Sequence, residues 1–365
     1  MHSSPSPRPP LPRRLVLGGA AALTAGAALA ASAPRAARTT AGAPPPPEPS
    51  PAVRPQLLLT EPQSPHTLVL AYDLPEAVTG SAGAAALRAL VAAWTRALDG
   101  SPRAALALGP GALHRLPLAA PALAELPPFP GDRLDPARSG ADVLVQLCGA
   151  EGPEQLDGAA AVLDGRAAGL LTPRWRQAGE LPPTAPGETP RNLFGFKDGT
   201  ANPAPAERDR IWLTDGPYAG GCHLVYRRIA MDVAGFTGLP TERQEEVFGR
   251  RREDGSPLGG SVERDEPDLY AKYPDGRYVV PATSHVRLAS PRQDGGARML
   301  RLGYGYRDGP EDEGLVFCAY LRDPGHFVRV QRRLAENDAL SAFTEHRASA
   351  VGWVPPAGPD GVPVF

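Results

Sequence analysis

Hydrophobic residues recur in two alternating patterns along residues 57–190. In residues 67–72 and 141–148 they dominate short runs bounded by turn-forming residues, which predicts β-strands. In residues 83–98 they recur every three or four positions, which predicts an amphipathic helix. Weaker runs of the same kinds predict strands at 104–108 and 169–175 and a helix at 154–163. The resulting order is β, α, β, β, α, β.

A second round of the same kind begins after residue 220. It contains expected strands at 222–231, 299–306 and 315–321 and expected helices at 241–248 and 325–334. Residues 249–281 are rich in Arg, Asp, Gly and Pro, which predicts an inserted loop of a length that is usually functional or disordered. A β, α, β, β, α, β order is the ferredoxin-like pattern. We therefore expect an α+β fold of two ferredoxin-like domains, over residues 58–190 and 191–365.

The first 57 residues do not continue this pattern. Arg13 and Arg14 precede an apolar run rich in Ala and Gly, so residues 1–33 are typical of a signal peptide read by the twin-arginine translocase. The alternative is a retained membrane anchor, but the run is shorter than the ~20 residues that a spanning helix needs. Residues 34–57 are rich in Pro and Ala and are expected to form a disordered linker. The expected location is the extracellular, cell-wall or periplasmic side of the membrane.

Composition narrows the classes of partner and site. The chain of 365 residues has a formal net charge of −2, which gives no electrostatic reason to expect nucleic acid. Its 45 Pro and 40 Gly exclude a long coiled coil. Cys148, Cys222 and Cys318 are widely spaced, which predicts neither a disulfide framework nor a cysteine-rich zinc site.

The stretch 192–203 is the strongest candidate for chemistry. It reads Asn-Leu-Phe-Gly-Phe-Lys-Asp-Gly-Thr-Ala-Asn-Pro and places one carboxylate, Asp198, between glycines and aromatic residues. Glycines let a ligand approach the backbone closely, and an apolar setting raises a carboxylate's pKa toward values suited to proton transfer. The alternative is ordinary turn chemistry, because Asp-Gly and Asn-Pro are common turn dipeptides.

A second candidate is the stretch 284–292, Ser-His-Val-Arg-Leu-Ala-Ser-Pro-Arg. His285 follows the predicted long loop, and arginines lie close downstream. A neutral imidazole can bind haem iron, and guanidinium groups suit haem propionates or a polarised peroxide. The alternatives are a structural histidine and a solvated basic surface.

Together these stretches resemble the dye-decolourising peroxidases. Similar segments are the Gly-Phe-Lys-Asp-Gly-Thr run, the Ser-His-Val-Arg-Leu run and residues 299–306, Met-Leu-Arg-Leu-Gly-Tyr-Gly-Tyr. Residues 225–229 and 247–250 and the segment 317–323 extend the similarity, in order, from about residue 60 to the C-terminus. Within the family, the chain is most similar to the exported deferrochelatase/peroxidase subgroup associated with iron uptake.

The resemblance implies a fold of the dimeric α+β barrel superfamily and a bound haem b (iron protoporphyrin IX) in the second domain. It implies that Asp198 is the distal acid/base, that His285 is the proximal iron ligand and that Arg301 is the distal arginine, which also reaches a haem propionate. The other haem-lining positions that it implies are Gly199, Thr200, Ala201, Ser290, Pro291 and Arg292.

The implied activity is oxidation of dyes, phenols or similar donors by hydrogen peroxide. An alternative is the deferrochelatase/peroxidase component of an iron-uptake system, which releases iron from haem or oxidises Fe(II) beside an iron permease. A third is a non-catalytic exported haem carrier, against which Asp198 and Arg301 argue, because storage needs only His285. A homodimer is a further expected partner.

The sequence departs from the family pattern at two places. Members usually place an acid against the proximal histidine, but residues 339–343 contain none, so the candidates are Asp338 and Glu345. Some members carry an Asn two residues after the distal arginine, where this chain has Gly303. Several oxidisable residues are either electron relays or core aromatics: Trp212, Tyr304, Tyr306 and Trp353. His223, His326 and His346 have no metal-like spacing and stay unassigned.

Overall fold

The first repeat of the fold forms the pattern that the sequence predicts. A computed structural model describes residues 53–365. The strands of this repeat are β1 (His66–Asp73), β2 (Arg103–Leu108), β3 (Val143–Gly149) and β4 (Thr172–Glu180). Its helices are α1 (Gly80–Leu98), α2 (Pro110–Arg115) and α3 (Pro153–Ala167). The predicted strands and helices are confirmed, although β4 begins three residues later than predicted and continues to Glu180.

The second repeat has the same strand order, but all of its helices except α7 have eight residues or fewer. Its strands are β5 (Cys222–Met231), β6 (Leu300–Gly309), β7 (Asp312–Leu321) and β8 (Thr344–Val354). Its helices are α4 (Val233–Thr237), α5 (Thr241–Phe248), α6 (His285–Leu288) and α7 (Pro324–Asn337). Short 3-10 helices occur at Leu57–Leu59, Pro136–Arg138, Pro205–Arg210, Gly216–Tyr218, Pro291–Asp294 and Ala339–Phe343.

Strand β8 is absent from our prediction. Its sequence begins with charged and polar residues and continues with Ala, Ser and Gly, which have low β propensity. It forms because it pairs with β5 along almost its whole length, from Cys222 opposite Val354 to Met231 opposite Thr344. Tertiary pairing therefore decides this element, and local preference does not.

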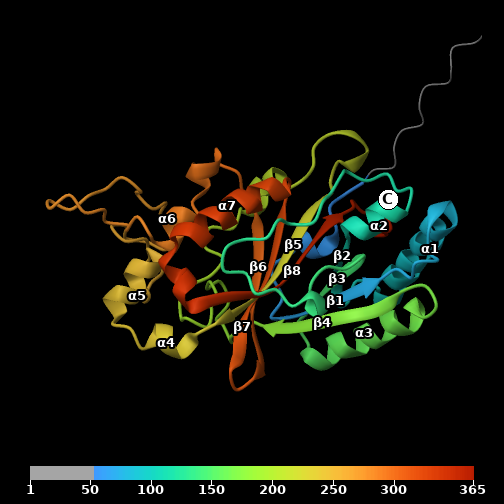
Figure 1. The fold of residues 1–365 in the computed structure, drawn as a ribbon, viewed down its shortest axis with the longest axis horizontal. Helices are drawn as coiled ribbons and strands as arrows, with labels where there is room; N and C mark the ends of the chain where they lie inside the picture. Colours follow the sequence, from blue (N-terminus) through green and yellow to red (C-terminus); the bar gives the residue numbers. More distant parts are fainter. Residues whose placement is uncertain (1–52) are drawn as a thin grey trace, which may run out of the picture. The chain divides into compact units, whose positions relative to one another are not determined.

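All eight of these strands close one barrel. The strand order is β1-β3-β2-β8-β5-β7-β6-β4, in which each repeat contributes the antiparallel order 4-1-3-2 of a ferredoxin-like sheet. The two sheets join where Leu108 of β2 meets Trp353 of β8 and where Glu180 of β4 meets Gly305 of β6. The fold is therefore α+β, with two ferredoxin-like repeats that share a single barrel (Figure 1).

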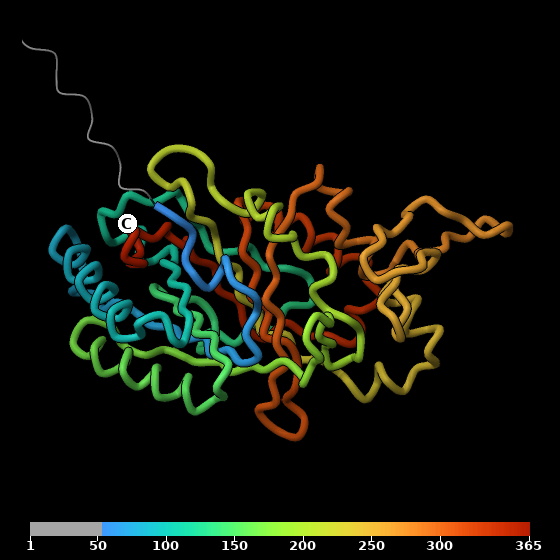
Figure 2. Tube along the Cα trace, turned by 180° about the vertical axis from the view of Figure 1, so that it is seen from behind, coloured from blue at the N-terminus to red at the C-terminus, as the bar shows by residue number. Residues whose placement is uncertain are grey.

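The two repeats cover the outside of the barrel differently. Helices α1 and α3 lie along the sheet of β1, β3 and β4, and they bury Leu87, Trp94 and Leu163 against it. Helices α4, α5, α6 and α7 lie at the other end, where an extended segment between α5 and α6 projects beyond them (Figure 1, Figure 2). The inside of the barrel is filled by aromatic and aliphatic side chains from both repeats, including Tyr226 and Tyr320.

The end of the predicted linker belongs to the fold. Arg54 forms an antiparallel bridge with Ala357, and Gln56 is buried beside β2. Backbone pairing therefore begins at Arg54, within the segment 34–57 that the sequence assigns to the linker. The predicted signal peptide and most of the predicted linker lie outside the described residues. Among residues 53–365, no helix has the length and apolar character needed to cross a bilayer.

Candidate functional site

Asp198 lies in a loop that the aromatic core holds in place. Phe194 and Phe196 are buried in a cluster with Phe236 and Phe248, and the rings of Phe196 and Phe248 stack with centroids 4.0 Å apart. Gly195 between them has φ +86°, a conformation that favours glycine. The Asp198 amide donates to Pro190 O at 2.8 Å. The burial of the phenylalanines thus fixes the loop, while the Asp198 carboxylate lines a cavity.

Arg301 reaches the same cavity from strand β6. Alternate residues of β6, namely Leu300, Leu302 and Tyr304, are buried inside the barrel. Arg301 and Gly303 therefore lie on the outer face of the strand, and both line the cavity. A Cβ built on Gly303 would lie 3.3 Å from Asp198 Oδ2, so Asp198 lies directly over this bare stretch of strand.

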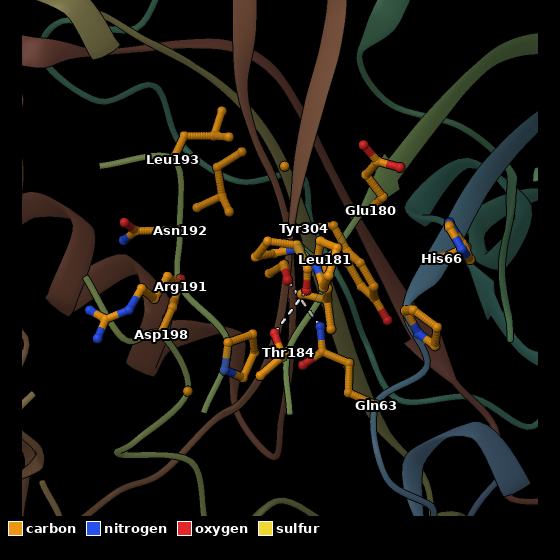
Figure 3. Close-up of a pocket in the computed structure, with 18 of the residues that line it drawn as sticks. Gln63, His66, Glu180, Leu181, Thr184, Arg191, Asn192, Leu193, Asp198 and Tyr304 are labelled. Atoms are coloured by element: carbon orange, nitrogen blue, oxygen red, sulfur yellow. Dashed lines mark hydrogen bonds between the residues drawn. The ribbon is translucent and has the colours of Figure 1, made fainter. Parts of the chain in front are cut away.

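The cavity has a volume of about 1090 Å³ and lies between β6 and the segment that follows β4. Figure 3 shows Asp198 on one side of it, Glu180 and His66 on the opposite side, and Tyr304 and Gln63 between them. Gln63 donates to Gly303 O at 2.9 Å. Within residues 53–365, neither the Asp198 carboxylate nor the Arg301 guanidinium makes a side-chain hydrogen bond or ion pair with protein. Both groups are thus available to a ligand.

His285 begins helix α6 and is held by a buried acid. Its Nδ1 donates to Asp338 Oδ2 at 2.7 Å, and Asp338 Oδ1 accepts from the Leu340 amide at 2.9 Å. The Asp338 side chain is 3% exposed, whereas that of His285 is 35% exposed. With Nδ1 occupied, the ring can offer Nε2 to a ligand. The predicted ambiguity between Asp338 and Glu345 is thereby resolved, because Glu345 instead pairs with Arg133 and Arg347.

The charges of Asp338, Arg301 and Asp198 all act on the pKa of His285. Burial lowers the pKa of His285, but the neighbouring Asp338 carboxylate outweighs it, so the pKa is raised above its ordinary value. Arg301 lowers the same pKa and Asp198 raises it, by smaller amounts. The structure therefore brings the three predicted central residues into one electrostatic neighbourhood, with Asp198 and Arg301 in the cavity.

The remaining predicted residues divide into two groups. Gly199 lines the cavity, with φ +104°. Thr200 instead donates to Glu263 of the long loop at 3.2 Å. Arg292 is half exposed and pairs with Glu266 at 2.5 Å. Ala201, Ser290 and Pro291 lie near these residues but are not part of the cavity wall.

Comparisons with known proteins identify the family. A family model described as "Dyp-type peroxidase, C-terminal" matches residues 189–358. The structure of DtpA from Streptomyces lividans, described as an oxyferrous complex, is 35% identical with a TM-score of 0.76, over 84% of this chain and 93% of that one. The chain belongs to the DyP-type peroxidase family.

Two curated relatives of this DyP-type chain carry different names. It is 40% identical over 261 residues to the dye-decolorizing peroxidase of Thermobifida fusca, and 37% identical over 238 residues to the deferrochelatase of Yersinia pseudotuberculosis. These matches cover 65% and 60% of this chain. They span only 59% and 54% of the lengths of the two relatives.

The long loop of this DyP-type chain is ordered against the Asp198 segment. Glu263 accepts from Lys197 Nζ at 2.7 Å and also from the hydroxyl of Thr189. Arg191 donates to the carbonyls of Arg252 and Glu253 at 2.6 and 2.7 Å. The sequence predicted a functional or disordered loop; its contacts show that it braces the loop that carries Asp198.

Two residues near the site were missed by the sequence reasoning. Asn202 contacts the backbone of Arg301, and Gln63 contacts that of Gly303. Asn202 was visible only as part of an Asn-Pro turn dipeptide, and Gln63 lies in a segment without any motif. Their partners are distant in sequence, so no local pattern could have identified them.

Proposed function

We propose that this chain is a haem peroxidase that uses hydrogen peroxide to oxidise dyes, phenols or similar donors. The observation that carries the proposal is that Asp198 and Arg301, whose charged groups have no side-chain partner within residues 53–365, share one cavity near a histidine bonded to a carboxylate. Family membership supports the same activity.

The residues present fit a haem. The cavity volume of about 1090 Å³ slightly exceeds the roughly 300–1,000 Å³ typical of ligand sites, and His285 lies outside the residues that line it. His285 has one free ring nitrogen, its other nitrogen is held by Asp338, and Phe248 lies against the ring with centroids 6.1 Å apart. Within residues 53–365, no three His, Cys, Asp or Glu side chains gather to hold a bare metal ion. A single histidine suits an iron whose other ligands come from a porphyrin.

Haem would supply the iron that binds and reduces peroxide, with His285 as its protein ligand. The hydrogen bond from Nδ1 to Asp338 fixes the ring orientation and tautomer and raises the basicity of the ligand. The outer positions Thr200, Ala201, Ser290, Pro291 and Arg292 belong to the same proposal as haem-lining residues.

Asp198 and Arg301, which line one cavity, would act on the peroxide. The Asp198 carboxylate takes the proton from one peroxide oxygen and delivers it to the other, so that water can leave. Arg301 supplies a fixed positive charge toward the oxygen on which negative charge develops.

The proposal is tested by Asp198→Asn and Arg301→Leu in haem-loaded protein. Loss of a positioned proton-transfer group or charge stabiliser slows the peroxide reaction by roughly 10²- to 10⁴-fold. The measurement is the second-order rate constant from stopped-flow absorbance. Glu188→Gln is the matched control, because this carboxylate lines the same cavity at an exposed position, and it should leave the rate within twofold. Wild-type rates in both site variants would reject the function.

A second candidate function is the deferrochelatase/peroxidase role in iron uptake. It is favoured by the 37% identity to a relative named deferrochelatase. In this role the chain would release iron from haem, with two protons replacing the iron in an intact porphyrin, or would oxidise Fe(II) for an iron permease. Porphyrin fluorescence that grows during incubation with haem supports iron release. Unchanged haem absorbance without fluorescence argues against it.

We also propose export through the twin-arginine pathway to the extracellular, cell-wall or periplasmic side. The support is the Arg13-Arg14 pair before an apolar run. Replacement of both arginines by lysine should retain the protein in the cytoplasmic fraction. Export of that variant at the wild-type level would contradict the proposal. A homodimer is a separate proposal, which sedimentation of the purified protein tests.

A further inference from the structure

Asn202 holds the backbone of Arg301 on the side of β6 that faces away from β7. Strand β7 accompanies β6 on one side, with Ala319 opposite Arg301. On the other side, the pairing of β6 with β4 is limited to Gly305 and Glu180. There, Asn202 Oδ1 accepts from the Arg301 amide at 3.0 Å, and Asn202 Nδ2 donates to Arg301 O at 2.7 Å. One side-chain amide thus takes the place of a neighbouring strand.

The same side chain belongs to the loop that carries Asp198. The backbone amide of Asn202 donates to Gly199 O at 2.8 Å, which closes a tight turn immediately after Asp198. A Cβ built on Gly199 would lie 3.5 Å from Asn202 Nδ2, so the side chain packs beside this turn. Asn202 is therefore a short connection between the Asp198 loop and the Arg301 strand.

We propose that Asn202 is a positioning residue that sets the distance and orientation of Arg301 relative to Asp198. The inference rests on the proposed function, because it assigns these two groups a joint action on peroxide. The Arg301 guanidinium makes no side-chain hydrogen bond or ion pair within residues 53–365, so its placement depends on its backbone. A displacement of about 1 Å between reacting groups can cost about 100-fold in rate.

The first repeat provides a matched control for this arrangement. Gln56 makes the same pair of bonds to one strand residue, because its Oε1 accepts from the Leu106 amide at 2.8 Å and its Nε2 donates to Leu106 O at 3.0 Å. Gln56 is buried and does not line the cavity. Gln56→Ala therefore removes the equivalent pair of bonds, together with one further bond from Nε2 to Pro355 O at 2.9 Å, without touching the site.

The experiment compares Asn202→Ala, Asn202→Asp and Gln56→Ala in haem-loaded full-length protein. We expect Asn202→Ala to lose amide-exchange protection at Arg301. We also expect it to slow the peroxide reaction by roughly 10- to 100-fold and to weaken fluoride binding to the ferric protein at least about tenfold. Gln56→Ala should lower the melting temperature by about as much as Asn202→Ala does. It should keep the peroxide rate and the fluoride affinity within about twofold of wild type.

Asn202→Asp keeps an acceptor for the Arg301 amide and nearly the same shape. It should therefore retain exchange protection at Arg301, with a peroxide rate between those of wild type and Asn202→Ala. This near-isosteric variant also decides the question if Asn202→Ala fails to fold. Loss of protection in Asn202→Asp with a wild-type rate would overturn the proposal.

The outcomes separate this inference from the proposed function. If Arg301→Leu slows the peroxide reaction but Asn202→Ala does not, the positioning role is overturned and the function stands. Equal slowing in Asn202→Ala and Gln56→Ala would also overturn it, because the effect would then be one of stability. If Asp198→Asn and Arg301→Leu both keep the wild-type rate, the proposed function fails. In that case, unchanged exchange protection at Arg301 in Asn202→Ala would also overturn the proposal that Asn202 holds the Arg301 backbone in place.

Discussion

The two repeats share a topology but use the outer face of one strand in opposite ways. Strand β2 of the first repeat places Leu106 and Leu108 on its outer face, where they pack in the core beneath α1 and α3. The corresponding strand β6 of the second repeat places Arg301, Gly303 and Gly305 there, and these residues line the cavity. The outer face of the strand packs under helices where leucines cover it. It lines a cavity where glycines leave the backbone uncovered.

The connections between the strands show the same contrast. In the first repeat, β1 and β2 are joined through the 19-residue helix α1, which covers the sheet. In the second, β5 and β6 are joined through α4, α5, the long loop 249–281 and α6, and none of these three helices has more than eight residues. Short elements leave room beside the sheet, and they bring His285 and the residues that brace Asp198 to its edge.

The largest expected effect comes from emptying the filled face. Leu106→Ala should lower the free energy of unfolding by about 2–5 kcal/mol, because it opens a cavity in a closely packed core. Chemical denaturation measures the loss. The peroxide rate per folded molecule should not change, since Leu106 is not among the residues that line the cavity. A loss of activity without a loss of stability would break the distinction between the two faces.

The converse change fills the bare face. Gly303→Leu should slow the peroxide reaction by at least about 100-fold, because even a Cβ at this position would lie 3.3 Å from Asp198 Oδ2 and from Leu315 Cδ1. Stopped-flow kinetics measures the peroxide rate, and haem absorbance shows separately whether haem is still bound. Gly158→Leu is the control, since a Cβ at this glycine of α3 meets no atom within 4 Å. Normal kinetics in Gly303→Leu would show that the bare strand is unnecessary.

A third prediction concerns the acid behind His285. Asp338→Asn keeps an oxygen for the Leu340 amide but replaces the oxygen that accepts from His285 Nδ1. Haem affinity should fall by roughly 10- to 100-fold, because the ring loses its orientation and tautomer. The rate of haem transfer to an excess of a scavenging protein measures this change. Asp323→Asn is matched to it, because Asp323 caps α7 by accepting from the Gly325 amide at 2.8 Å, and it should have no such effect.

These predictions also show what the sequence could and could not establish. Hydrophobic runs located β1, α1, β3, β5 and α7, because each carries its own periodic signal. They missed β8, whose stability comes from pairing with β5. The motif residues Asp198, His285 and Arg301 were named from a resemblance; the structure places Asp198 and Arg301 in one cavity and His285 outside its wall, where their charges still act on it. Asn202 and Gln63 act through backbone groups about 100 and 240 positions away, which no local pattern records.

The smallest effect concerns the part of the second repeat that a segment of the first repeat covers. His346 of β8 contacts Arg227, which is paired with Asp132 from the connection between α2 and β3. Burial first, and then the charge of Arg227, lower the pKa of His346 to about 3. Because this pKa lies below the ordinary 6.5, the unfolded chain takes up the proton first as pH falls. The contribution of His346 to the free energy of unfolding is therefore fully present above pH 6.5 and is lost as the pH falls toward 3.

Between pH 7 and pH 5 this group should remove about 1–2 kcal/mol from the free energy of unfolding. Denaturation at several pH values measures the slope. His346→Asn should flatten it, whereas replacement of His114, which lies on α2 outside this cluster, should not. An unchanged slope in His346→Asn would assign the acid sensitivity to another group.

The closed barrel has a consequence for the order in which the chain can be assembled during synthesis. One of its two seams joins Leu108 to Trp353, so β2 has no permanent neighbour on that side until the last strand has been made. A ribosome-bound chain can complete the first sheet early, but its edge stays open, and an open edge invites pairing with other chains. Removal of the final 22 residues would therefore release a protein that contains Asp198, His285 and Arg301 and still has two unsealed edges. Such a chain should aggregate rather than bind its cofactor.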